Sequence, residues 1–181
     1  MRILPIVAAA AAVLSFAGAA SAAGQRGTLI LTPQVGAAQG VLAERLLRAH
    51  NVERAALRLP PLAWDPALAA SASDWGRVLA ASGTMRHANQ SAQGENLWMG
   101  TRGAFTPEQM VGNWASEKRM FMAQPFPNVS RTGNWADVGH YTQIVWRGTT
   151  HVGCAIVSSS SRDFLVCRYS PPGNVRGRPV Y

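Results

Sequence analysis

The fold of this 181-residue chain is decided by one stretch, Gly139-His140-Tyr141-Thr142-Gln143-Ile144-Val145-Trp146-Arg147-Gly148-Thr149. We predict a strand over 141–146, after a loop rich in Pro, Asn and Gly at 124–139. Alternate residues of a strand share a face, so His140 is expected on the same face as Ile144 and Trp146. The imidazole of His140 is therefore predicted to point toward a packed layer.

Two further strands are predicted downstream, over 152–157 and 164–169, with a serine-rich turn at 158–161 between them. This pattern indicates a hairpin. Its arms carry the chain's two cysteines, Cys154 and Cys167. In an oxidising compartment we expect them to form one disulfide, worth about 3 kcal/mol in the chain-entropy treatment. A reactive thiol is the alternative.

Helices are predicted upstream of the strands. Apolar residues recur every three or four positions over 41–57, and Asp65 and Thr106, each followed by proline, are N-caps of two further helices. The Gly-rich stretch 83–106 is interpreted as a long connection of the functional or mobile kind. Helices first and strands last favour an α+β fold, with helices packed on an antiparallel sheet.

The N-terminus has the pattern of a signal peptide. Arg2 is followed by an uncharged apolar stretch and by the small residues Ala20-Ser21-Ala22, so residues 1–22 are predicted to be removed. Residues 23–36 are expected to form a flexible lead to a single domain at 37–181. The apolar stretch is too short to span a bilayer, and no later run approaches 18 apolar residues. We therefore expect a secreted protein, extracellular or periplasmic, that is not an integral membrane protein.

The chain is basic, with 17 Lys and Arg against 9 Asp and Glu and a formal net charge of +8. A basic surface favours anionic partners such as acidic lipids or cell-wall polymers. The alternative is that the arginines, which are scattered, reflect only solubility and codon usage. Nucleic acid is not an expected partner, because the sequence has no basic stripe and no nucleic-acid motif.

One carboxylate lies where an apolar residue is expected. Met110, Trp114 and Phe121 share a stripe of the third predicted helix, and Glu117 falls on that stripe. A core-facing carboxylate must find a partner or be protonated. Glu117 either has such a partner in the interior or lies at the edge of the stripe, paired with an arginine.

Three other polar residues are candidates for a site with Glu117: His87, Glu95 and His140. Neutral imidazoles suit zinc or copper, and carboxylates either ligate the ion or orient the imidazoles. The same four groups could do acid–base chemistry. Their spacing does not by itself bring them together, and neither an HExxH nor a GxSxG motif is present. His50 and His151 are interpreted as structural.

Four ordered motifs resemble signatures of the CAP superfamily of cysteine-rich secretory proteins, insect venom antigens and plant pathogenesis-related proteins. They are 139–149, 164–174, 94–97, and 50–54 leading to 62–65, and the resemblance extends over 41–181. The pattern is most like the secreted plant-type members, while the Ala-rich leader and the few cysteines indicate a bacterial secreted homologue. The tail 171–181 resembles the plant segment released as a signalling peptide, but Val180 interrupts its terminal Pro-Tyr.

The resemblance implies a three-layer α-β-α sandwich with a central, mostly antiparallel sheet. It also implies a cleft formed by His87, Glu95, Glu117 and His140, in which His87 and His140 bind a divalent metal, with zinc the expected ion. The implied function is that of a monomeric binding module for a lipid, a sterol or an anionic cell-surface component. The alternative is a metal-assisted peptidase in which Glu95 or Glu117 activates water.

Aromatic and other large apolar residues in the predicted loops bear on the choice of ligand. They could line an apolar groove, or they could plug the core beneath the loops. These residues are Trp98, Met99, Phe105, Phe126 and Trp135.

Overall fold

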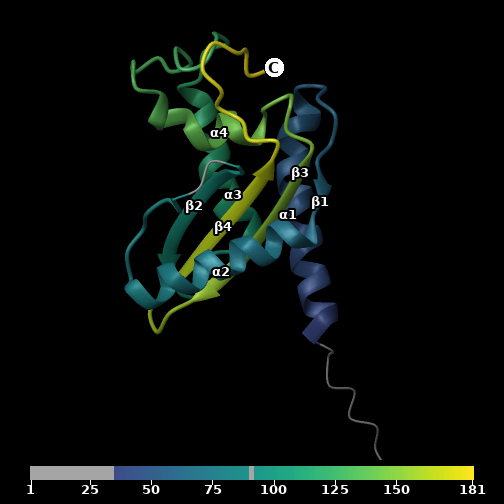
Figure 1. Ribbon diagram of the computed structural model, residues 1–181, viewed down its shortest axis with the longest axis vertical. Helices are drawn as coiled ribbons and strands as arrows, with labels where there is room; N and C mark the ends of the chain where they lie inside the picture. The colour runs from purple at the N-terminus through teal and green to yellow at the C-terminus, as the bar shows by residue number, and fades with distance from the viewer. Residues whose placement is uncertain (1–34, 90–91) are drawn as a thin grey trace, which may run out of the picture. The chain divides into compact units, whose positions relative to one another are not determined.

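The computed structural model describes residues 35–89 and 92–181. Its centre is a four-stranded mixed sheet in the order β1-β3-β4-β2 (Figure 1). The short β1 (Ala63–Trp64) runs parallel to β3 (His151–Ser158). The β3–β4 and β4–β2 pairs are antiparallel, with β4 spanning Arg162–Ser170 and β2 spanning Gly94–Thr101.

Helices cover both faces of this sheet (Figure 1). On one face α2 (Pro66–Ser82) packs on β3 and β4, and on the other lie α1 (Val35–Ala56) and α3 (Pro107–Ala115). Asp65 and Thr106 cap α2 and α3 as predicted. The structure therefore confirms an α+β fold of three layers with a mostly antiparallel sheet.

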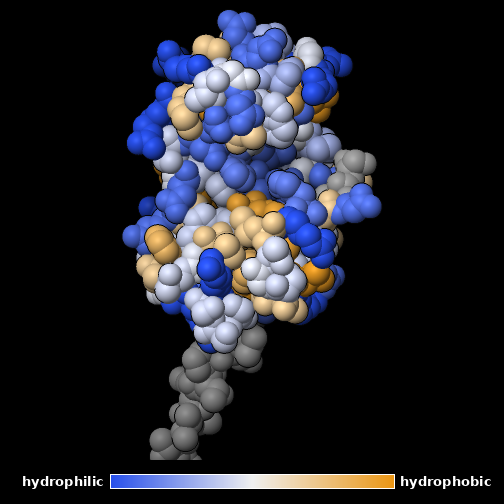
Figure 2. Space-filling view, turned by 90° about the vertical axis from the view of Figure 1, so that its left-hand side faces the viewer, coloured by the Kyte–Doolittle hydropathy of each residue, from blue (hydrophilic) through white to orange (hydrophobic). Residues whose placement is uncertain are grey.

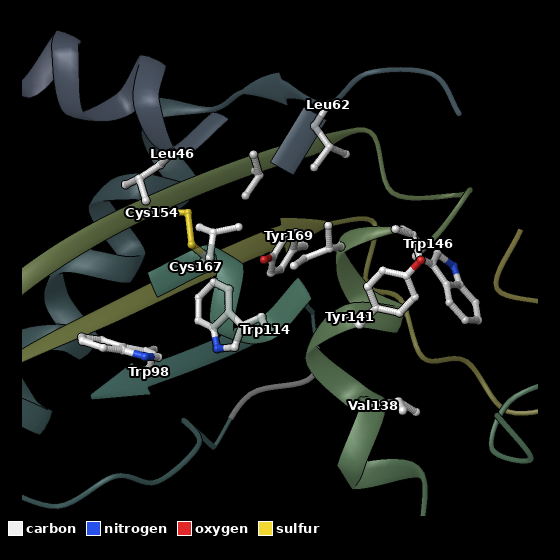
Figure 3. Packing of buried hydrophobic residues seen from close by; sticks show 14 of the residues in the cluster. Leu46, Leu62, Trp98, Trp114, Val138, Tyr141, Trp146, Cys154, Cys167 and Tyr169 are labelled. Carbon is white, nitrogen blue, oxygen red and sulfur yellow. A yellow bond between two sulfur atoms is a disulfide. The ribbon is translucent and has the colours of Figure 1, made fainter. Parts of the chain in front are cut away.

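Alternation along β4 divides the core between the two faces. Phe164 and Val166 pack with Leu79 of α2, whereas Cys167 and Tyr169 belong to the larger cluster on the opposite face. That cluster also contains Leu46 of α1, Trp114 of α3, and Tyr141 and Trp146 (Figure 3). The fold is thus held by two apolar interfaces that share one sheet.

The predicted hairpin and its disulfide are confirmed. Cys154 and Cys167 lie directly opposite each other on β3 and β4 and are bonded. Gly153 explains how α2 can lie so close to β3: a Cβ there would be 2.3 Å from the backbone nitrogen of Ala69. A side chain at position 153 would therefore push the helix off the sheet.

The strand predicted over 141–146 is wrong. Residues 141–144 belong instead to the helix α4 (Gly139–Ile144), which directly follows the 3₁₀ helix η2 (Trp135–Val138). The backbone groups at both ends of α4 find hydrogen-bond partners that lie far away in the sequence. The Glu117 carboxylate accepts hydrogen bonds from the backbone N–H groups of His140 and Tyr141, and Arg54 donates to the carbonyl of Ile144. Tertiary contacts therefore override the strand-like composition.

Two other expectations are also corrected. The stretch 83–106 is not a simple connection, because it contains β2, which pairs with β4 along its whole length. The helix that carries Trp114 ends at Ala115, so Glu117 lies on the 3₁₀ helix η1 (Ser116–Arg119) rather than on an α-helical stripe. Phe121 lies beyond η1 and bridges to Ser130.

The predicted signal peptide at 1–22 and most of the predicted lead at 23–36 lie outside the described residues, and α1 begins at Val35. In the part of the chain that is described, no helix is both long enough and apolar enough to cross a bilayer.

Candidate functional site

Glu117 and His140 form the first of two histidine–carboxylate pairs. His140 lies in the first turn of α4, and its Nδ1 is 2.6 Å from Oε1 of Glu117. The other carboxylate oxygen, Oε2, accepts hydrogen bonds from the backbone N–H groups of His140 and Tyr141, both at 3.0 Å. Glu117 thus pairs with a histidine and not with an arginine, and it also caps α4.

His87 and Glu95 form the second pair. The Nδ1 atom of His87 is 2.5 Å from Oε1 of Glu95, and the same oxygen accepts from the backbone N–H of Ala88. The His87 side chain is 66% exposed and that of Glu95 only 5%. The hydrogen bond to Glu95 raises the pKa of His87, against the opposing effect of burial. His87 is therefore a surface imidazole held by a buried carboxylate.

Both imidazoles present the same chemistry. Each Nδ1 bonds to a carboxylate, and neither Nε2 has a hydrogen-bond partner among residues 35–89 and 92–181. A carboxylate that accepts from Nδ1–H selects the tautomer whose Nε2 carries the free lone pair, which is the form that binds metals. The His140 ring also stacks on Trp114, with centroids 5.7 Å apart. This donor set fits a divalent ion such as zinc.

The structure joins the four predicted residues as two pairs and gives no contact between the pairs. Their union in one metal cleft stays a prediction. Within the described ranges, three or more potential ligand atoms lie within 4.8 Å of one another only around His50, Cys154 and Cys167. These two sulfurs are bonded to each other, so they are not thiolates and do not make a metal site.

A surface view supports a polar hollow on the β2 side of the molecule. Figure 2 shows that this face is hollowed across its middle, with hydrophilic residues above and within the depression and hydrophobic residues along its lower edge. β2, which carries Glu95, is the edge strand on this side.

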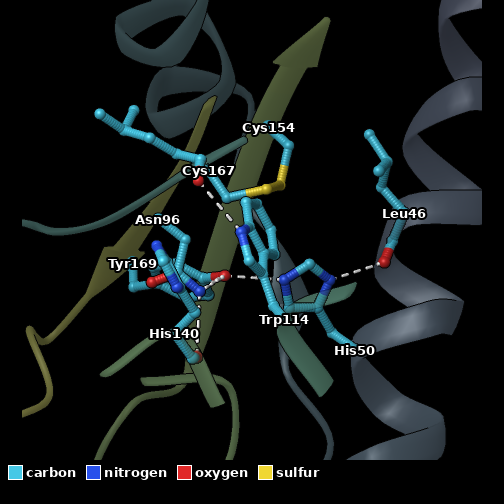
Figure 4. Close-up of a disulfide and its surroundings, with 9 residues drawn as sticks. Leu46, His50, Asn96, Trp114, His140, Cys154, Cys167 and Tyr169 are labelled. Carbon is cyan, nitrogen blue, oxygen red and sulfur yellow. Dashed lines mark hydrogen bonds between the residues drawn. A yellow bond between two sulfur atoms is a disulfide. The ribbon is translucent and has the colours of Figure 1, made fainter. Parts of the chain in front are cut away.

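A buried hydrogen-bond network links α1 to the backbone of His140 (Figure 4). His50 donates from Nδ1 to the carbonyl of Leu46, and its Nε2 accepts from the Tyr169 hydroxyl, both at 2.8 Å. Asn96 donates to the Tyr169 oxygen and to the His140 carbonyl, both at 3.1 Å. Burial lowers the pKa of His50 to about 4. The structural role predicted for His50 is confirmed, although its partners could not be read from the sequence.

The sequence interpretation missed Arg168. This arginine lies toward the C-terminal end of β4, opposite Glu95, and its Nη2 is 2.9 Å from Oε2 of Glu95. It occurs in an otherwise apolar strand, Phe164-Leu165-Val166-Cys167-Arg168-Tyr169, and this contrast is the signal that could have revealed it.

Two hollows lie away from the pairs formed by His87 and His140. One, of about 600 Å³, runs between α1 and α3, and its lining includes Arg48, Ala49, Val52, Val111 and Gly112. The other, of about 500 Å³, lies between α1, α2 and β3. None of the large apolar residues predicted to lie in loops lines either hollow, and two of them, Trp98 and Met99, lie on β2 and not in a loop. Trp98 and Phe126 are buried, and the more exposed Phe105 and Trp135 pack against them.

The chain has close similarity to known proteins. The profile of the family described as CAP, cysteine-rich secretory protein family, matches residues 47–169. Pathogenesis-related protein 1C of Nicotiana tabacum is 39% identical over 137 residues, covering 75% of this chain and 78% of that protein. Venom allergen 3 of Solenopsis invicta is 34% identical over 136 residues, covering 70% of this chain and 58% of the allergen.

Solved structures share the fold. The crystal structure of NaASP2 with Zn2+ aligns with a TM-score of 0.66 at 23% identity, covering 77% of this chain and 85% of NaASP2. The hookworm platelet inhibitor aligns with a TM-score of 0.64 at 19% identity, covering 78% of this chain and 75% of the inhibitor.

Proposed function

Because the chain belongs to the CAP family of cysteine-rich secretory proteins, we propose that it is a secreted binding module. In this proposal His87 and His140 hold a divalent metal, and an amphipathic ligand occupies the groove between α1 and α3. The family description and the signal-peptide pattern at 1–22 support secretion.

The metal proposal rests on the two histidines whose Nδ1 atoms are each held by a glutamate. Such a carboxylate orients the ring and makes Nε2 a better ligand. His87 and His140 would be the ligands, with Glu95 and Glu117 behind them. A bound zinc ion would supply a Lewis-acidic positive charge that can attract an anionic group. The same fold has been solved with Zn2+ in NaASP2, which supports zinc as the first ion to test.

Calorimetric titration with zinc at pH 7.5 and pH 5.5 tests the metal site. A ligating histidine must be neutral, and the ordinary pKa of histidine is about 6.5, so zinc binding should weaken about tenfold or more at pH 5.5. The raised pKa of His87 makes this loss larger. His87→Gln and His140→Gln should each remove binding, whereas His151→Gln, at an exposed histidine outside the pairs, should not. Equal affinity at the two pH values would contradict the proposal.

The peptidase alternative is not favoured, because both carboxylates are already engaged. Glu117 bonds to an imidazole and to two backbone N–H groups. Glu95 bonds to an imidazole and a backbone N–H through Oε1, and its Oε2 is buried beside Arg168, where water does not reach it. A general base needs a lone pair within hydrogen-bond reach of a water molecule. We therefore propose no catalytic residue.

The groove between α1 and α3 suits an amphipathic ligand. Ala49, Val52 and Val111 provide apolar surface, while Glu44, Arg48 and the Arg45–Glu108 ion pair add charge of both signs. A fatty acid is the ligand to test, because its chain would lie on the apolar surface and its carboxylate would lie against Arg48.

A lipid-extraction assay with oleic acid tests the groove, using Gly112→Leu as the blocking variant. Gly112 lines the groove, and a Cβ there would meet no atom within 4 Å, so leucine should enter the groove without disturbing the fold. Gly40→Leu is the matched control, because Gly40 is a helical glycine in equally open space outside that lining. Loss of extraction in Gly112→Leu alone supports the proposal, and equal extraction by both variants contradicts it.

A further inference from the structure

The carboxylates of Glu95 and Glu117 are held in the same way. Each uses Oε1 for the Nδ1 of a histidine and Oε2 for a positively polarised anchor. For Glu117 the anchor is the N-terminal backbone of α4, whose N–H groups carry the positive end of the helix dipole. For Glu95 the anchor is the guanidinium of Arg168. The two histidine–carboxylate pairs of the proposed metal site thus have the same hydrogen-bond arrangement, and only the group that holds Oε2 differs.

Arg168 is an unusual anchor because it is almost completely buried, with 2% of its surface exposed. It lies on the same face of β4 as Phe164 and Val166, which pack against α2. Its Nε and Nη1 atoms have no hydrogen-bond partner. The contact with Glu95 is an ion pair at 2.9 Å without the alignment of a hydrogen bond. Removing a charge from water in this way is unfavourable, and packing alone does not explain why an arginine lies here.

We propose that Arg168 is a positioning residue for the metal site. Its charge fixes the carboxylate of Glu95, and Glu95 in turn fixes the ring orientation and tautomer of His87. The register supports this, because Glu95 and Arg168 are direct cross-strand partners on β2 and β4, where side chains on one face meet. The inference rests on the proposed function, in that His87 is taken to bind the metal.

The test compares Arg168→Met with Arg162→Met. Arg162 lies on the same strand but is exposed, so its replacement makes the same change of charge without touching Glu95. Zinc affinity at pH 7.5 should fall about 10- to 100-fold in Arg168→Met, as for other outer-shell partners of metal ligands. It should stay unchanged in Arg162→Met. Arg168→Lys, which keeps the charge, should recover part of the affinity.

A second readout needs no metal. Imidazole ¹⁵N spectra, recorded where His87 is neutral, report which ring nitrogen carries the proton. Wild type should show the Nδ1–H form at both His87 and His140. In Arg168→Met the His87 signals should move toward a mixture of tautomers, while those of His140 stay fixed. A purely structural role for Arg168 would not move one histidine alone.

The outcomes separate the two proposals. Wild type that fails to bind zinc overturns the metal function, whereas the ¹⁵N spectra still decide the role of Arg168. A folded Arg168→Met protein with unchanged zinc affinity and unchanged His87 spectra overturns the positioning role. Should Arg168→Met not fold, the double variant Glu95→Gln/Arg168→Gln removes both buried charges. Wild-type affinity and His87 tautomer in that variant would also overturn the inference.

Discussion

At the scale of single residues, one carboxylate both caps a helix and orients a histidine. Glu117 uses Oε2 for the first turn of α4 and Oε1 for the Nδ1 of His140. The pattern of the sequence predicted that Glu117 needs a partner, but it suggested an arginine as one option and did not suggest helix capping. The capping role was hidden because the helix itself was predicted as a strand.

Glu117→Gln should separate these two roles. The amide oxygen can still accept from the N–H groups of α4, so the loss of stability should stay below about 1 kcal/mol. The amide NH₂ would donate to Nδ1 of His140 and so select the tautomer in which Nε2 carries the proton. Zinc affinity, measured by calorimetry, should then fall at least about tenfold. Glu117→Ala should lose both the capping of α4 and the hydrogen bond to His140, and its free energy of unfolding in urea should fall by about 1 kcal/mol or more.

His50 should make stability depend on pH. Its pKa is about 4 in the folded protein, below its ordinary value of 6.5. Between these two pKa values the unfolded state therefore binds more protons than the folded state. The contribution of neutral His50 to the free energy of unfolding is complete above pH 6.5 and is lost as the pH falls toward 4. The loss amounts to about 3 kcal/mol. His87 acts in the opposite sense, because its raised pKa gives stability below pH 6.5 that is lost at higher pH.

Urea unfolding of wild type and His50→Gln at pH 7, 5.5 and 4 measures the effect of His50. The variant should be less stable than wild type at pH 7, and its stability should fall less between pH 7 and pH 4. Parallel pH profiles for the two proteins would show that His50 is not kept neutral by burial.

At the scale of elements, α4 is a short helix that depends on distant side chains. Its composition is rich in Tyr, Thr and Ile, which favour strands. Six residues also leave most backbone groups without partners inside the helix. Arg54, which is buried, donates to the carbonyls of Ile144 and Trp146 just at and beyond its C-terminal end. The helix therefore forms because α1 and η1 provide partners for its two ends.

Arg54→Met should destabilise the protein by at least about 3 kcal/mol in urea unfolding, because it leaves buried carbonyls without donors. Arg54 also donates to the carbonyls of Pro60 and Thr149, so the loss extends beyond α4. Arg58→Met is the control, since Arg58 is exposed and lies just beyond the end of α1, and it should change stability by less than about 0.5 kcal/mol. Similar effects of both changes would show that the carbonyls find other donors.

At the scale of the whole molecule, the C-terminal tail is part of the fold. The backbone N–H of Arg147 donates to the carbonyl of Val180, and that of Phe126 donates to the carbonyl of Arg178. The Val180 side chain is buried, although this residue interrupts the Pro-Tyr ending of the plant-type tail. Release of the tail as a peptide would first have to break these contacts.

Val180→Ala should cost about 1–2 kcal/mol, because it removes two buried methyl groups and leaves a small cavity. Val175→Ala, in the exposed part of the same tail, should cost less than about 0.5 kcal/mol. Urea unfolding measures both, and limited proteolysis should cleave the tail faster in Val180→Ala alone. Equal behaviour of the two variants would show that the tail does not contribute to stability.

Features that depend on local patterns could be predicted from the sequence. Asp65 and Thr106 mark helix starts because their side chains cap the adjacent backbone N–H groups. The hairpin and the Cys154–Cys167 disulfide follow from alternation and from a short turn. The ordered motifs indicated the family, and the resemblance implied the three-layer architecture and the candidate site residues.

Features that depend on contacts between distant segments became known only from the folded structure. It made 139–144 a helix, because Glu117 and Arg54 satisfy its ends. It made 94–101 a strand, because β4 offers a complete row of backbone partners. It also placed Arg168 against Glu95, since pairing across strands depends on register and not on distance along the chain. Local propensity is a small free energy, and hydrogen bonding of buried groups outweighs it.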